Sequence, residues 1–133
     1  MTLKGACLCG KTTITVDSDC EDQIVCHCLG CKKSSGSAFS TNIIALQKDV
    51  TIEGPVKTFE IKSPSGNLVS RVFCDNCGSA ISHTSAAFGE SQAVQTGNFD
   101  GFADIPFSAE LFVKDRWAGI PPIPGASQVQ TMP

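Results

Sequence analysis

The chain has 133 residues, of which 41% are hydrophobic and 17% charged, and its formal net charge is −3. This composition excludes an intrinsically disordered chain and predicts one globular domain over residues 1–133. The slightly acidic balance argues against a nucleic-acid partner. No run approaches the roughly 20 apolar residues that a membrane span needs, so no membrane partner is expected either.

Short β-strands dominate the predicted secondary structure. Seven stretches alternate in polarity or are rich in β-branched residues, and each is bounded by Gly, Pro, Asn or Ser. They are residues 11–16, 40–46, 50–54, 56–61, 67–73, 91–97 and 109–114. The SPSG segment between KTFEIK and LVSRVF predicts a hairpin. A helical turn or two is expected only over 32–39, and the Pro- and Gly-rich tail, 118–133, is expected to wrap the surface or fray.

Eight cysteines are the main chemical feature of the sequence. The first ten residues, MTLKGACLCG, lack the basic start and apolar core of a secretory signal peptide, which predicts a cytoplasmic or nuclear protein. In such a reducing compartment, clustered cysteines indicate metal ligands, whereas in a secreted chain they indicate disulfides. We therefore expect cytoplasmic localisation and bound zinc.

Two cysteine pairs predict a structural zinc site. Cys7 and Cys9 form a CxC pair in GACLCGK, and Cys74 and Cys77 form a CxxC pair in FCDNCGSAI. Residues two apart on an extended strand point to the same face, so the CxC pair is expected to present both sulfurs together. The two pairs supply four thiolates, the ligand set of a closed structural zinc.

Three further cysteines, Cys26, Cys28 and Cys31, lie within CHCLGC. Three protein ligands leave a fourth position for water or substrate, which is typical of catalytic zinc. The alternative is a second closed site with Cys20 or His27 as fourth ligand. Cys20 lies in a polar, turn-like stretch and is interpreted as a free surface thiol. His27 lies between two ligands, so we expect its side chain to point away from the metal and pack.

Together, GACLCGK, CHCLGCKKSSGSAF, FCDNCGSAI, VQTGNFD and ELFVKDRWAGI resemble the glutathione-dependent formaldehyde-activating enzyme family, whose domain also occurs in centromere protein V. The resemblance implies a mainly β fold, the β-tent, of small antiparallel sheets stabilised by two zinc ions. It implies a structural zinc on Cys7, Cys9, Cys74 and Cys77, and a catalytic zinc on Cys26, Cys28 and Cys31. The chain has Glu110 where many members of the family have a histidine.

Two functions follow from these motifs. The first is a zinc-dependent carbon–sulfur lyase with a small-molecule substrate. It adds glutathione, the candidate cosubstrate, to formaldehyde to give S-hydroxymethylglutathione, or acts on another small electrophile or thiol conjugate. The alternative is a non-catalytic binding module with two structural zincs, and the fourth ligand of the Cys26 site distinguishes the two. The sequence predicts no oligomeric state.

Aromatic and hydroxyl residues near the motifs receive simpler interpretations. Trp117 is expected in the core or at its edge rather than in the wall of a pocket. Four phenylalanines are expected in the core: Phe39, Phe73, Phe99 and Phe112. Three serines are expected either to donate hydrogen bonds to thiolates or to cap a short helix: Ser34, Ser35 and Ser37.

Overall fold

Two β-sheets make up most of the fold. The computed structural model describes residues 2–132. Its small sheet contains β1 (Thr2–Ala6), β2 (Thr13–Asp17) and β5 (Val50–Glu53), in the order β1–β2–β5. Its large sheet contains β3 (Gln23–Cys26), β4 (Ser40–Leu46), β6 (Val56–Lys62), β7 (Leu68–Cys74), β8 (Ala80–Ser85), β9 (Ser91–Gln95), β10 (Phe107–Leu111) and β11 (Ser127–Gln128). The order in this sheet is β11–β10–β3–β4–β9–β8–β7–β6.

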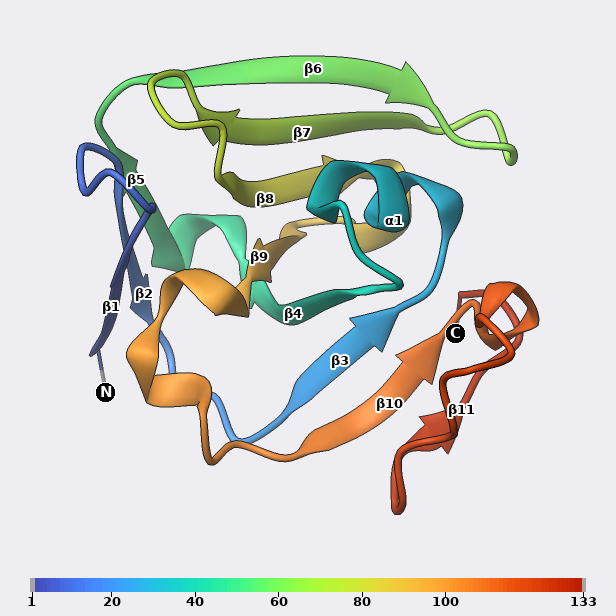
Figure 1. The fold of residues 1–133 in the computed structure, drawn as a ribbon. Helices are drawn as coiled ribbons and strands as arrows, with labels where there is room; N and C mark the ends of the chain where they lie inside the picture. The colour runs from blue at the N-terminus through green and yellow to red at the C-terminus, as the bar shows by residue number, and fades with distance from the viewer. Residues whose placement is uncertain (1, 133) are drawn as a thin grey trace.

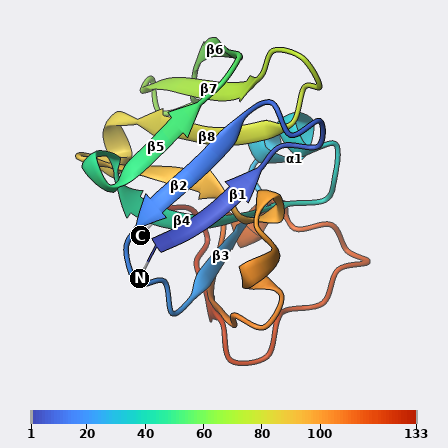
Figure 2. The same cartoon turned by 90° about the vertical axis from the view of Figure 1, so that its left-hand side faces the viewer.

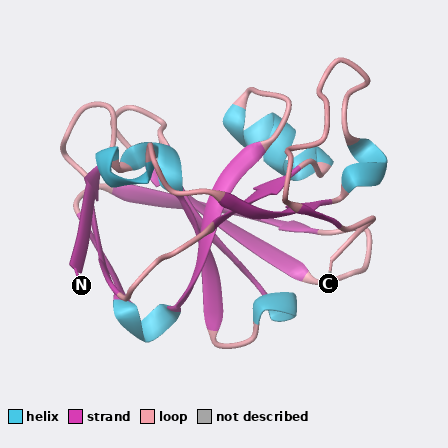
Figure 3. Cartoon of the chain, turned by 90° about the horizontal axis from the view of Figure 1, so that it is seen from below, coloured by secondary structure: helices cyan, strands magenta, loops and turns pink. Residues whose placement is uncertain are grey.

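The large sheet curves around one short α-helix. Figure 1 shows the sheet running from β11 and β10 up to β6, with α1 (Leu29–Ser35) in front of it. Figure 2 shows the small sheet packed across one side of the large one. Short 3₁₀ turns lie at strand ends (Figure 3): Gln47–Asp49, Ala86–Phe88, Thr96–Asn98, Asp100–Phe102 and Val113–Asp115. None of the helices among residues 2–132 has the length and apolarity needed to cross a membrane.

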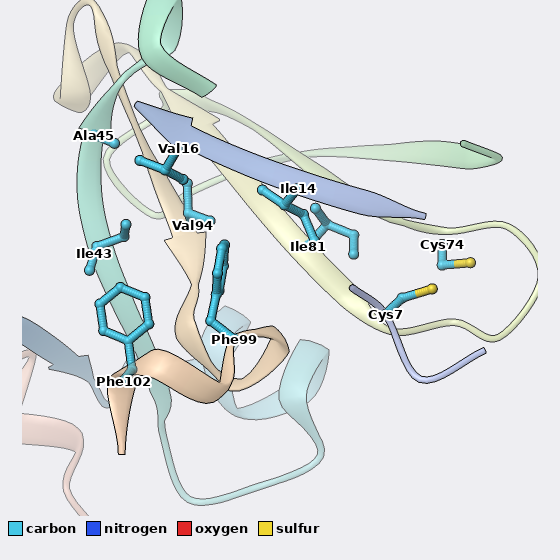
Figure 4. Close-up of a cluster of buried hydrophobic side chains, with 10 residues drawn as sticks. All are labelled: Cys7, Ile14, Val16, Ile43, Ala45, Cys74, Ile81, Val94, Phe99 and Phe102. Carbon is cyan, nitrogen blue, oxygen red and sulfur yellow. The ribbon is translucent and has the colours of Figure 1, made fainter. Parts of the chain in front are cut away.

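The main core lies between the small sheet and one face of the large sheet. Strand β2 alternates buried and exposed positions and directs Ile14 and Val16, both fully buried, onto that face. Phe99 and Phe102 complete the core, with their rings edge to face and their centroids 5.5 Å apart. Figure 4 shows these side chains together, with Cys7 and Cys74 at one end of the same cluster. The main core therefore leads directly into a cysteine site.

Most of the strand predictions agree with the structure. The strand predicted over 40–46 is β4, and the predicted hairpin is β6–β7, in which Val56 pairs with Cys74 and Lys62 with Leu68. The predicted strand over 109–114 is wrong at its end, because β10 ends at Leu111. There Phe112 adopts a left-handed φ of 55°, and a 3₁₀ turn follows.

Several expectations about burial and helix position are corrected by the structure. Of the four phenylalanines expected in the core, only Phe99 is buried, and Phe39, Phe73 and Phe112 are half-buried. Trp117 is 54% exposed, with the Lys32 ammonium 5.6 Å from the ring centroid, so it is not a core residue. The helix begins at Leu29, before Cys31 rather than after it.

The tail follows the outer edge of β10 instead of fraying. Strand β11 pairs with β10 in parallel, matching Ala109 with Ser127 and Glu110 with Gln128, and β10 is also parallel to β3. The Val113 amide donates to Val129 O at 3.0 Å. Met1 and Pro133, the ends of the predicted domain, lie outside the described residues. The predicted fold class is confirmed: the protein is mainly β, with two sheets and two cysteine clusters that could bind zinc.

Two candidate metal centres and an adjoining pocket

The first candidate centre joins two turns that are distant in the sequence. The Sγ atoms of Cys7, Cys9, Cys74 and Cys77 all lie within 4.8 Å of one another. The sulfurs of Cys7 and Cys9 are 3.5 Å apart, and those of Cys9 and Cys74 are 3.8 Å apart. Zinc–sulfur bonds of about 2.3 Å in a tetrahedron imply sulfur–sulfur separations of about 3.8 Å. The cluster therefore has the size of a four-thiolate zinc site.

Each cysteine pair of this centre lies on a tight turn closed by a glycine. The Gly10 amide donates to Cys7 O at 3.0 Å, and the Gly78 amide donates to Cys74 O at 2.9 Å. Gly10 has φ of 80° and Gly78 has φ of 79°, a region that favours glycine. The expectation that Cys7 and Cys9 lie on a strand is wrong, because β1 ends at Ala6. A turn, and not strand alternation, brings their sulfurs together.

Hydrogen bonds stabilise negative charge in the four-cysteine cluster. The Thr12 amide donates to Cys7 Sγ at 3.3 Å. Ser79 Oγ lies 3.2 Å from Cys77 Sγ and accepts from the Leu8 amide at 3.1 Å, which links the two turns. The Ser79 side chain, followed by its backbone, lowers the pKa of Cys77 to about 5. Such bonds orient metal-binding thiolates and tune their basicity.

The second candidate centre contains the three cysteines of CHCLGC. Cys26 is the last residue of β3, Cys28 is the N-cap of α1, and Cys31 lies in its first turn. The Cys31 amide donates to Cys28 Sγ at 3.4 Å, so a thiol takes the place of the usual hydroxyl or carboxylate cap. All three sulfurs lie within 4.8 Å of one another. A strand end, a cap and a helix therefore aim three ligands at one point.

The three thiols share negative charge unequally. Hydrogen bonds from Cys26 and Cys31 lower the pKa of Cys28 to about 2. The reciprocal hydrogen bonds to Cys28 and Cys31, together with burial, raise the pKa of Cys26. Three thiolates this close repel one another, so a bound cation would stabilise the fully ionised cluster.

Neither alternative fourth ligand joins this trio. Cys20 is a free, half-buried cysteine whose Sγ lies 3.9 Å from Ser18 O, and it packs against the main core. The interpretation of Cys20 as a surface thiol is therefore wrong. His27 is fully buried and, as expected, faces away from the trio, with Nε2 2.8 Å from Glu110 Oε1. Among residues 2–132, no fourth His, Cys, Asp or Glu groups with the three sulfurs.

Glu110, which the sequence left without an assignment, is the centre of a buried network. Its Oε2 accepts from the Ile123 amide at 2.8 Å and from Gln128 Nε2 at 2.7 Å. Arg116 Nη2 lies 3.4 Å from the same oxygen. Burial raises the pKa of Glu110, but these donors and His27 outweigh burial, and the net pKa is lowered. The carboxylate therefore fixes the tail beside the trio, where Val129 and Met132 pack against the cluster of Cys26, Cys31 and Leu111.

A pocket that sequence reasoning missed includes Arg71, the arginine whose Nη2 lies 3.9 Å from Cys31 Sγ. It has a volume of about 170 Å³ and is lined by Ser34, Phe59, Arg71, Val72, Phe73, Gly78, Ala80, Ser82, His83 and Gln95. A second hollow of about 300 Å³ shares Ala80 and Gln95 with it and is lined also by Ser35, Ser37 and Phe39. Burial, followed by the nearby charge of Arg71, lowers the pKa of His83 to about 4. Arg71 is therefore the positive charge of this pocket at neutral pH.

Ser34 and Ser35 bond to the helix backbone and not to the sulfurs. Ser35 Oγ donates to Cys31 O at 2.6 Å and Ser34 Oγ lies 3.4 Å from the same carbonyl. A side-chain hydrogen bond to a sulfur of the trio comes from Arg71, whose Nη2 is 3.9 Å from Cys31 Sγ. The predicted alternatives are thus resolved for Ser34 and Ser35 in favour of helix bonds.

Both centres fit zinc by the chemistry of their donors. Soft thiolates select zinc over hard cations such as magnesium or calcium. The structure brings the seven predicted cysteines together in the two predicted groups. Their division into structural and catalytic ligands remains a prediction.

Comparisons with known proteins agree with this arrangement. The sequence profile described as glutathione-dependent formaldehyde-activating enzyme matches residues 2–115. The fold is similar to a crystal structure of a Rhodobacter sphaeroides protein solved in a structural genomics programme. Identity is 19%, the TM-score is 0.61, and the match covers 79% of this chain and 99% of the other. A comparison with curated proteins gave no match. The family profile covers most of the chain, so the protein belongs to the glutathione-dependent formaldehyde-activating enzyme family.

Proposed function

We propose that the protein is a cytoplasmic, zinc-dependent carbon–sulfur lyase that joins a thiol to a small aldehyde. Glutathione and formaldehyde are the proposed substrates, as the family name suggests. The proposal rests above all on one observation. The three sulfurs of Cys26, Cys28 and Cys31 converge without a fourth His, Cys, Asp or Glu among the described residues, and a pocket lies alongside.

The proposed reaction is an addition. The thiol sulfur bonds to the carbonyl carbon, the carbonyl electron pair moves to oxygen, and the thiol proton ends on that oxygen, giving a hydroxymethyl thioether. When bound, zinc supplies a positive charge that lowers the pKa of a thiol or water and polarises a carbonyl. The three cysteines provide the ligands, and the four-cysteine cluster is proposed to hold a second, structural zinc.

The surrounding residues support this chemistry by position and charge. Arg71 lies against Cys31 Sγ and lowers the pKa of Cys28, after the larger effects of the neighbouring thiols. It offsets the negative charge that three thiolates place around one divalent ion. The eight cysteines are free of disulfides, which supports the proposal of a reducing compartment.

The test combines metal content with catalysis. Freshly purified protein is expected to hold two zinc ions and to consume formaldehyde in the presence of glutathione. Cys28→Ser should lose activity and one zinc, whereas Cys20→Ser is the matched control, since Cys20 lies in neither cluster. A protein that holds two zincs but consumes formaldehyde no faster than buffer would instead be the binding module.

A further inference from the structure

A row of three side chains crosses the sheet beside the cysteine trio. Phe59 on β6 pairs with Arg71 on β7, which pairs with His83 on β8. Cross-strand partners project to the same face of a sheet, so the three side chains form one surface. All three line the 170 Å³ pocket, with Gln95 of β9 beyond them.

The Arg71 guanidinium lies between this pocket and the trio. Its Nη2 is 3.9 Å from Cys31 Sγ, and its Nη1 donates to Ser34 Oγ at 3.2 Å. None of the ion pairs found among residues 2–132 includes Arg71. A half-buried guanidinium with five donors and no carboxylate partner has unused capacity for a planar anion.

A glycine in the helix leaves room for this guanidinium. A Cβ atom on Gly30 would lie 2.7 Å from Arg71 Nη2, closer than real Cβ contacts permit. Gly30 is inside α1 and not at a position of positive φ, so the backbone itself does not require glycine. The space above Gly30 is occupied by the arginine, which contacts Cys31 of the trio and also lines the pocket.

The rest of the pocket suits a short organic anion. Phe59 is 59% exposed and supplies an apolar wall. His83 is neutral at pH 7, since its pKa is lowered to about 4 by burial and by Arg71. The pocket thus offers one fixed positive charge and one apolar wall.

We propose that Arg71 selects thiol substrates that contain a carboxylate, by pairing with that carboxylate while the thiol sulfur occupies the open side of the Cys26–Cys28–Cys31 site. This inference rests on the proposed function, because it assigns the substrate class of the same site. Arg71 is the specificity-determining residue, and Gly30 positions it.

The experiment measures thiol binding to protein loaded with cobalt(II) in place of zinc, by the change in the sulfur-to-cobalt absorption band. The probes are 3-mercaptopropionate and its neutral isostere 3-mercaptopropionamide. A charge-assisted bond predicts that wild type binds the acid at least about tenfold more tightly than the amide. Arg71→Met should abolish this preference while leaving amide binding in place, and Arg71→Lys should retain part of it.

Two further variants separate the position of the Arg71 guanidinium from the general effect of positive charge near the pocket. Gly30→Ala keeps the arginine but displaces its guanidinium, so it should reduce the preference for the acid. Lys62→Met removes one positive charge from the exposed end of the same hairpin, outside the pocket, and should leave the preference unchanged.

The outcomes separate this inference from the proposed function. Equal binding of acid and amide by wild type would overturn the inference and leave the function standing. Equal weakening of both probes by Arg71→Met would also overturn it, since the arginine would then act only on the cysteines. If neither probe changes the cobalt spectrum, the proposed function fails and the inference fails with it.

Discussion

Replacing Glu110 by glutamine tests whether one carboxylate fixes the tail beside the trio. The side chain is fully buried and accepts three hydrogen bonds of 2.7–2.8 Å, from His27, the Ile123 amide and Gln128. Glutamine has the same shape but replaces one oxygen by a donor. If the new amide nitrogen takes the Oε2 position, it faces three donors, from the Ile123 amide, Gln128 and Arg116.

The other orientation of the amide is no better. At the Oε1 position, the nitrogen needs His27 Nε2 as an acceptor, which moves the ring proton to Nδ1. That atom is buried and has no hydrogen-bond partner. Each charge-assisted bond contributes about 1.5–3 kcal/mol, and an unpaired buried donor costs about 1–3 kcal/mol. We therefore expect Glu110→Gln to lower the free energy of unfolding by about 2–4 kcal/mol.

Urea denaturation of the zinc-loaded protein measures this loss. Trp117, the only tryptophan, lies at the start of the tail and reports the transition by fluorescence. Glu60→Gln, on the exposed strand β6, is the matched control and should change stability by no more than about 0.5 kcal/mol. Hydrogen exchange at the Ile123 and Val129 amides should accelerate in Glu110→Gln. A variant as stable as wild type, with unchanged exchange, would refute the buried network as the anchor of the tail.

Three other predictions use the same structure. Cys74→Ser should unfold the domain, because a structural zinc contributes on the order of 10 kcal/mol of binding free energy. Cys28→Ser should leave the circular dichroism spectrum largely native. An equal loss of circular dichroism in both variants would contradict two centres with separate roles. The folded-state pKa of Glu110 is lowered, so its stabilisation is present above its unfolded pKa and is lost as pH falls through the folded value. The stability gap between wild type and Glu110→Gln should therefore shrink below about pH 4, and a gap constant from pH 7 to 3 would contradict this. Gly78 has a φ of 79°, so Gly78→Ala should lower the free energy of unfolding by about 1 kcal/mol or more, measured by thermal unfolding. Gly119→Ala is the control, because Gly119 has open space around it and no positive φ.

The cysteine spacing predicted both clusters because each pair or trio is local in the sequence. Turn geometry within three to six residues decides where the sulfurs point, and a glycine follows each pair of the four-cysteine cluster. The helix start at Leu29 was missed for a related reason. Its cap is Cys28, and a thiol is not among the residues that usually mark a helix start.

The pocket could not be predicted, since it depends on partners that only the sheet brings together. Arg71 lies beside Phe59 and His83 because β7 pairs with β6 and β8. Strand β8, AISHTS, was not expected, as it lacks a clear alternation of apolar residues. Glu110 was noted as unusual, but its partners are 6 to 83 positions away in the sequence. A signal was present in retrospect: Arg71 lies in the middle of a strand that ends at the first cysteine of the CxxC pair.

The four-cysteine cluster also has a consequence for how the chain matures. Cys9 and Cys74 are 65 positions apart, whereas Cys26, Cys28 and Cys31 span only six. At a synthesis rate of about 5–20 residues per second, Cys9 emerges from the ribosome roughly 3–13 s before Cys74. Once Cys31 has followed, the trio is complete, whereas Cys7 and Cys9 still lack Cys74 and Cys77. We therefore expect metal delivered to a nascent chain to reach the trio before the four-cysteine cluster.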